Sequence, residues 1–196
     1  MKALLYLSLL LISSCKINQE NNPSNDLYIQ LLEEYVKQDS IVIKGFVSNR
    51  LRPYKYYNIE YYKGTEVPQP LGGFGESYVN EQSLIRYINR VAIDSNSNKY
   101  FSSSCDSIHL KHQIILSSKL KELPDISIWS KKYSINAENL DKEFYIFYIP
   151  LFNCDSTQVY LQYDYNKGIY GQGNGAVFEK QNNKWKLVKW ISRWIT

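Results

Sequence analysis

The sequence predicts an α+β domain, with an N-terminal helix and a mostly antiparallel sheet that ends in a C-terminal β-meander. Three observations indicate this fold class. One segment near the start has helical periodicity, and the last third has alternating apolar and polar runs separated by turn signals. The 196 residues also include 18 Tyr, 4 Trp and 7 Phe, which β-sheets accommodate well. About 170 residues remain beyond the leader and tether described next, enough for one domain with an adequate core.

Residues 1–14 predict an export signal. Lys2 provides a positive start, and the apolar run from Ala3 to Ile12 is about half the length of a membrane-spanning helix. Two small residues then precede Cys15. An ordinary secretory signal followed by an incidental cysteine is the alternative interpretation of this pattern.

The segment Ile12-Ser13-Ser14-Cys15 resembles the lipobox of bacterial lipoproteins, which is an aliphatic residue, two small residues and a cysteine. The resemblance implies cleavage before Cys15, a diacylglyceryl thioether on its sulfur, and a third acyl chain such as palmitate on the new amino group. Two or more chains give stable anchoring. The protein is therefore expected in the bacterial cell envelope, on the inner or outer membrane, in the periplasm or at the surface.

Residues 15–26 are predicted to be the lipidated cysteine and a flexible tether, because they are polar and contain Pro23. About ten residues span at most ~35 Å, so the domain, residues 27–196, stays close to its membrane. The formal net charge of +4 is too small to indicate a nucleic-acid partner, which would need a basic stripe.

The first half of the domain predicts two helices and two strands. Leu27, Leu31 and Tyr35 repeat at four-residue spacing, which indicates a helix over 26–37 capped by Ser24 or Asn25. A second helix begins after the cap Asn80 and continues to Arg90, with Leu84, Ile85 and Ile88 on its buried side. Strands are expected over 40–47 and 54–63, a Pro- and Gly-rich loop over 68–75, and a polar loop over 94–104.

The second half predicts mainly strands. Residues 106–116 fit both a strand and a helix, and a helical turn is expected over 118–123 before Pro124. Residues 144–152 are apolar on both faces and indicate a covered strand, in which Pro150 requires an edge or a bulge. In 159–165 the alternation indicates a half-buried strand with Leu161 and Tyr163 facing the core. Strands over 176–180 and 185–191 flank a two-residue turn at Asn182-Asn183, because Asn tolerates positive φ.

The ending from Phe178 to Ile195 resembles the terminal hairpin of uncharacterised Gram-negative envelope lipoproteins. In those proteins a Lys-x-Asn-Gly-Lys-Trp-Lys turn precedes a last strand that ends in Trp, and this chain has Asn183 at the Gly position. Many small α+β domains, including NTF2-like ones, end similarly. The resemblance implies a fold and no activity.

Cys105 and Cys154 remain once Cys15 is lipidated. Outside the cytoplasm two such cysteines can form a disulfide, which would stabilise the fold by about 4 kcal/mol. The alternative is two unpaired thiols, because sequence spacing does not establish disulfide geometry.

No catalytic residue, cofactor or metal is predicted. His109 and His112 share one face only if their segment is helical, and a metal site needs three or four convergent ligands. Gly171-Gln172-Gly173-Asn174-Gly175 does not lead into a helix, as a dinucleotide site requires. It is therefore interpreted as a glycine hairpin loop or bulge.

Tyrosines over 54–62 suggest an aromatic binding surface. Ile59 marks the buried face of the expected strand, which would place Tyr54, Tyr56 and Tyr62 on an exposed platform for a glycan or peptide. The alternative is that Tyr serves here simply as a good strand residue.

These patterns favour a membrane-anchored lipoprotein whose domain is a non-enzymatic binding or interaction module for a protein, glycan or small-molecule ligand. The alternative is a small lipid-anchored hydrolase or isomerase with a cavity in an NTF2-like α+β domain. A pocket with two or more convergent polar groups would favour the enzyme. A structural envelope protein, the third option, would be favoured by an exposed apolar patch.

Overall fold

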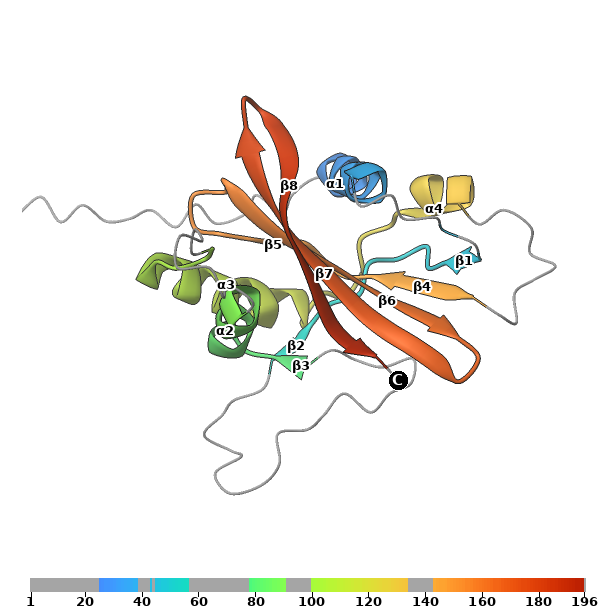
Figure 1. Ribbon diagram of the computed structural model, residues 1–196, viewed down its shortest axis with the longest axis horizontal. Coiled ribbons are helices and arrows are strands. Elements are labelled where there is room, and N and C mark those ends of the chain that lie inside the picture. The colour runs from blue at the N-terminus through green and yellow to red at the C-terminus, as the bar shows by residue number, and fades with distance from the viewer. Residues whose placement is uncertain are drawn as a thin grey trace, which may run out of the picture.

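The computed structural model describes residues 25–38, 43, 45–56, 78–90, 100–133 and 143–195. Within these residues the chain forms the predicted α+β fold (Figure 1). The helices are α1 (Asn25–Gln38), α2 (Glu81–Arg90), α3 (Ser104–Ser117) and α4 (Ser127–Tyr133). The strands are β1 (Phe46–Val47), β2 (Lys55–Tyr56), β3 (Tyr78–Val79), β4 (Phe144–Phe147), β5 (Leu151–Phe152), β6 (Gln158–Lys167), β7 (Tyr170–Gln181) and β8 (Lys184–Ile195).

The main sheet has the strand order β1-β4-β6-β7-β8, and β5 also pairs with β6. β1 lies parallel to β4, and the other pairs are antiparallel. The predicted C-terminal meander is therefore confirmed as β6-β7-β8. The turn at Asn182 and Asn183 is confirmed too, because both residues have positive φ (51° and 60°) and Gln181 pairs with Lys184 around them.

Helices cover both faces of this sheet (Figure 1). α1 and α4 lie on one face, and α2, α3 and the small parallel pair β2-β3 lie on the other. The prediction that β6 is half-buried is therefore wrong: Tyr160, Gln162 and Asp164, assigned to its solvent face, are buried on the α2/α3 face. Alternation separates the two faces of a strand but does not show whether a helix covers the polar one.

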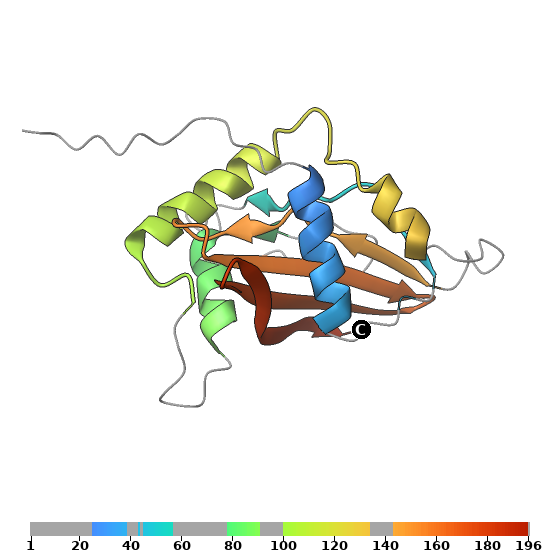
Figure 2. The ribbon, with the colours of Figure 1, turned by 90° about the horizontal axis from the view of Figure 1, so that it is seen from above.

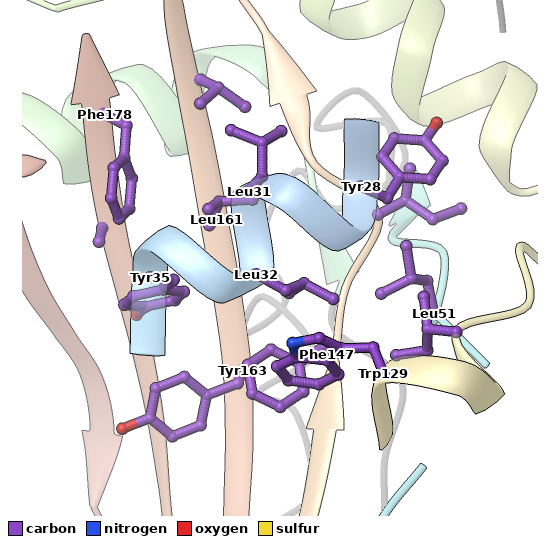
Figure 3. Close-up of a cluster of buried hydrophobic side chains, with 14 of the residues drawn as sticks. Tyr28, Leu31, Leu32, Tyr35, Leu51, Trp129, Phe147, Leu161, Tyr163 and Phe178 are labelled. Atoms are coloured by element: carbon purple, nitrogen blue, oxygen red, sulfur yellow. The ribbon is translucent and has the colours of Figure 1, made fainter. Parts of the chain in front are cut away.

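The α1 face carries an apolar and aromatic core (Figure 3). α1 runs across the strands (Figure 2), and its Tyr35 ring lies 5.6 Å from Tyr163 and 5.5 Å from Phe178. From α4, Trp129 packs edge-on against Phe147 at 5.1 Å. Leu161 and Tyr163 are buried in this core, which confirms the predicted core face of β6.

The three longer helices are largely as expected. The helix predicted over 26–37 is confirmed as α1, and the helix after Asn80 is confirmed as α2. Asn80 caps α2, because its Oδ1 accepts a hydrogen bond of 2.8 Å from the Ser83 amide. The ambiguous segment 106–116 is helical in α3, which begins with a capping box between Ser103 and Asp106.

The connections depart further from the sequence expectations. After α3 the chain makes turn hydrogen bonds from the amides of Lys119 and Leu120, but no helix extends over 118–123. The short helix α4 was not predicted. The strand expected over 144–152 is interrupted between β4 and β5 near the buried Pro150, in agreement with the break that proline requires.

The strands expected over 40–47 and 54–63 are present only as the two-residue β1 and β2 within the described residues. The loop expected over 68–75 lies outside those residues, as do residues 1–24 with the export signal, Cys15 and the tether.

Amide side chains tie three helices to backbone segments by pairing with both an N–H and a C=O group. Gln38 of α1 donates to the Trp185 carbonyl (2.9 Å) and accepts from the Leu187 amide (2.7 Å). Gln113 of α3 binds the Phe152 carbonyl (2.7 Å) and amide (3.0 Å) in the same way. Asn89 of α2 does so at Tyr100 (2.8 and 3.0 Å). Each amide pairs with a backbone N–H and a backbone C=O, as a neighbouring strand would. Gln38 does this at β8 and Gln113 at β5.

Candidate functional site

The predicted tyrosine platform does not form as expected. Tyr54 is 0% exposed, and its ring stacks on Tyr148 with 5.0 Å between centroids. It points inward because β2 lies on the α2/α3 face of the main sheet rather than at a free surface. Tyr56 is half-buried beneath Lys111, whose Nζ lies 5.7 Å from the ring centroid. Tyr62 lies outside the described residues.

A buried polar network extends along β6 next to Tyr54. Tyr148 Oη donates a hydrogen bond of 2.7 Å to Asp164 Oδ2, and Gln162 Nε2 donates one of 3.1 Å to Asp164 Oδ1. Tyr160 Oη donates to Gln162 Oε1 at 3.4 Å. These four residues are all buried and use their polar atoms on one another, as buried polar groups must. We refer to Tyr148, Tyr160, Gln162 and Asp164 as the β6 network.

Glycines on the neighbouring strand make room for this network. Gly173 lies opposite Asp164 and Gly175 lies opposite Gln162 in the β6–β7 register, so these glycines share the face of the network. The Tyr160 ring covers Gly175 so closely that a Cβ there would lie 2.8 Å from its carbons. A larger residue at Gly175 would therefore displace Tyr160.

The segment 171–175 is strand, so the predicted hairpin loop is wrong. The bulge alternative agrees with a register shift between Gly173 and Asn174 in the pairing with β8. Sequence reasoning missed the β6 network, although the two-residue spacing of Gly171, Gly173 and Gly175 was a usable signal. That spacing places all three glycines on one face of a strand.

The two histidines both lie on α3. His109 is half-buried and His112 is exposed. Burial, followed by the proximity of His112, lowers the pKa of His109, and Asp106 opposes this shift. Among the described residues, no group of three or more His, Cys, Asp or Glu side chains is arranged to hold a metal ion.

Three interactions attach α3 to β5 and to the loop that follows it. Of the two alternatives for Cys105 and Cys154, the structure shows the disulfide, with a Cα–Cα distance of 5.8 Å. The buried Asp106 accepts hydrogen bonds from the amides of Ser103 and Cys154, both at 2.9 Å. Gln113 adds its pair of bonds to Phe152. The disulfide and the hydrogen bonds of Asp106 and Gln113 therefore fix the orientation of α3 on the domain.

The outward side of α3 carries large apolar residues. Leu110 and Ile114 face the core, but Ile108 is 70% exposed and Leu116 is 52% exposed. Apolar residues thus occur around the whole helix, which explains why the sequence of 106–116 fits a strand as well as a helix. An exposed apolar surface on a firmly attached helix is a candidate interaction site.

A depression of about 640 Å³ lies along α2, and its described lining residues are Ser83, Arg86, Tyr87 and Asn89. It is open to solvent, and Asn89 already binds the Tyr100 backbone. Arg86 gives this surface a positive charge.

Within the described ranges, none of the helices combines the length and the apolar character needed to cross a membrane. No protein-family model, curated protein or solved structure matches the chain significantly.

Proposed function

We propose that this protein is a membrane-anchored lipoprotein of the bacterial cell envelope whose domain is a non-enzymatic binding or interaction module. The distribution of the three cysteines carries the proposal. Cys105 and Cys154 bond to each other, so the remaining cysteine is Cys15, which ends the lipobox-like segment. Disulfides persist mainly outside the cytoplasm, and this supports the interpretation of residues 1–14 as an export signal.

The placement of polar groups supports a binding module over a hydrolase or isomerase. An active site needs a nucleophile or base that a substrate can reach. In the part of the chain that the structure describes, the Asp164 carboxylate is buried and bonded to Tyr148 and Gln162. Large apolar residues instead lie exposed on helix surfaces and at a hairpin turn, where a macromolecular partner can reach them.

The anchor is tested by metabolic labelling with palmitate and by membrane fractionation in a bacterial host. We expect the wild-type protein to be labelled and to require detergent for release, because two or more acyl chains give stable binding. Cys15→Ala should remove the label and either release the protein or leave an unprocessed precursor.

Cys105→Ala and Cys154→Ala are the matched controls, because each removes a cysteine that is not in the lipobox-like segment. Both variants should keep the label. A mature, labelled Cys15→Ala protein in the membrane fraction would refute the proposal.

A further inference from the structure

The outer face of α3 combines apolar and basic side chains. We define this α3 outer face as Ile108, Lys111, His112 and Leu116, with Lys119 in the turn that follows the helix. All five residues are exposed. Ile108 and Leu116 lie eight residues apart, about 12 Å along the helix axis, on the side opposite the buried Leu110 and Ile114.

Single exposed apolar residues are ordinary on protein surfaces, but here two of them repeat on one helix among lysines. α3 is not loosely packed, since the Cys105–Cys154 disulfide and Asp106 hold it to the β5–β6 loop and Gln113 holds it to β5. The inward side of the helix has its own apolar residues in the core. Among the described residues, Ile108 and Leu116 of the outer face therefore do not contribute to the hydrophobic core.

The charge around these residues is basic. Lys111 lies at the edge of the face, with its Nζ 5.7 Å from the Tyr56 ring centroid, and Lys119 and the exposed Lys121 follow it. These three lysines outweigh the adjacent exposed Glu122. Although α3 as a whole is not an amphipathic membrane helix, exposed apolar residues flanked by lysines provide the two contributions that bind a protein surface to a membrane interface, apolar burial and attraction to anionic lipids. A positive flank favours a surface with anionic headgroups, and each lysine near such a surface strengthens binding by about fivefold.

The position of the proposed anchor points to the same surface. Nine residues separate Cys15 from Asn25, the first residue of α1, and this segment spans at most ~35 Å. α1 and α3 pack on opposite faces of the sheet (Figure 1), but the beginning of α1 and the end of α3 both lie toward the same edge of the sheet, at the top of Figure 2. A lipid on Cys15 would thus hold α3 within reach of the bilayer.

We infer that the α3 outer face lies against an anionic lipid surface and sets the orientation of the domain on its membrane. This inference rests on the proposed lipid anchor. Ile108 and Leu116 enter the boundary between headgroups and acyl chains, while Lys111 and Lys119 lie at the level of the lipid phosphates. The β6–β7 turn, at the other end of the sheet (Figure 2), points away from this contact.

The test is amine-specific acetylation of the mature, full-length lipoprotein in vesicles, read by mass spectrometry at Lys111 and Lys119. In vesicles of phosphatidylcholine and phosphatidylglycerol, both lysines should react about fivefold more slowly than in phosphatidylcholine alone. Lys184, in the β7–β8 hairpin, is the internal reference. The protection should weaken at about 1 M salt, where the Debye length is about 3 Å.

The double variant Ile108→Asn/Leu116→Asn should lose the protection while it still floats with the vesicles. Ile169→Asn, at a position that is 87% exposed in the β6–β7 turn, is the matched control and should keep it. All three substitutions lie at exposed positions, and thermal melting verifies that each variant is folded.

Equal acetylation of the lysines in both kinds of vesicle, with the protein still bound, would overturn the inference and leave the anchor intact. Protection that depends on protein concentration and not on lipid would also overturn it, because a second copy of the chain would then cover the face. If the protein carries no lipid, the proposed function fails, and the same labelling with added vesicles still decides whether the face binds anionic lipid.

Discussion

The two faces of the sheet are built in different ways. The α1 face is a continuous apolar core in which Leu31, Leu32 and Tyr35 pack on Leu161 and other sheet residues. The α2/α3 face has a polar centre instead, with the β6 network beside glycines of β7. Amide side chains hold helices on both faces, Gln38 on α1 and Asn89 and Gln113 on α2 and α3, but a disulfide is present only on the α2/α3 face among the described residues.

The difference teaches how each face obtains its stability. Burial of apolar side chains stabilises without directional requirements. The stability of the α1 face therefore depends mainly on how much side-chain volume it buries, and less on individual hydrogen bonds. A buried polar centre contributes little net free energy, and its hydrogen bonds are costly to break. The α2/α3 face therefore depends on individual hydrogen bonds and on the disulfide. A substitution that removes one such bond should reduce stability more on this face than on the α1 face.

The largest expected effect is the loss of the disulfide. Cys105→Ala/Cys154→Ala should lower the free energy of unfolding by about 4 kcal/mol, because the bond closes a long loop in the unfolded chain. Urea denaturation followed by circular dichroism measures this change, and a reductant should have the same effect on the wild-type protein.

The double variant itself is the control, since its denaturation midpoint should not respond to reductant. If reduction leaves the wild-type midpoint unchanged, the hydrogen bonds of Asp106 and Gln113 are sufficient to hold α3, and the contrast between the faces is weaker than stated.

The second prediction concerns volume on the α1 face. Leu161→Ala should cost about 2–5 kcal/mol, the range for buried leucine truncations, because Leu161 is fully enclosed beneath α1. The measurement is the urea midpoint at unchanged slope. Leu116→Ala, which truncates a half-exposed leucine, is the matched control and should change stability by less than about 0.5 kcal/mol. Equal effects of the two substitutions would contradict the assigned core.

The third prediction compares the same chemical change on both faces. Tyr148→Phe preserves the ring that stacks on Tyr54 but removes the hydroxyl that donates to Asp164. It should cost about 1–3 kcal/mol, the range for removing one partner of a buried polar group. Tyr28→Phe on the α1 face should change stability by less than about 0.5 kcal/mol. Thermal melting decides this, and a harmless Tyr148→Phe would show that the network has no role in stability.

The sequence was informative wherever a pattern is local. Four-residue spacing predicted α1, and the cap at Asn80 predicted α2, because a helix face and its cap are both local features. Alternation together with Asn182-Asn183 predicted the β6-β7-β8 meander and its last turn. Local patterns could not distinguish helix from strand for α3, because its own apolar residues occur on all sides of the helix.

Burial of polar residues was not predictable from the same patterns. Tyr54, Gln162 and Asp164 are covered by segments distant in the chain, and local alternation contains no information about that cover. The expected exposure of Tyr54 is wrong for this reason. A strand face expected to be exposed can be an interior one when helices pack on both sides of a sheet.

The smallest expected effect tests a surface contact at the edge of the α1 face. Lys132 Nζ of α4 lies 2.6 Å from Glu33 Oε1 of α1, and Tyr133 Oη donates to Glu33 Oε2 at 2.8 Å. Partial burial raises the pKa of Glu33, but the bonds from Lys132 and Tyr133 outweigh this effect, and the pKa lies below its usual value. The contact therefore stabilises the fold above the unfolded pKa, and this contribution is lost as the pH falls through the lower folded pKa.

Lys132→Ala should accordingly lower stability by only a few tenths of a kcal/mol near neutral pH, because both partners are largely solvated. The difference from wild type should disappear at a pH below the folded pKa of Glu33, where Glu33 is protonated in both proteins. Urea midpoints at the two pH values measure it, and Lys121→Ala, at an exposed lysine that forms no described contact with Glu33, controls for the loss of charge. A difference that persists in acid would mean that the Lys132 side chain acts through packing, and the α1–α4 contact would then be an extension of the apolar core.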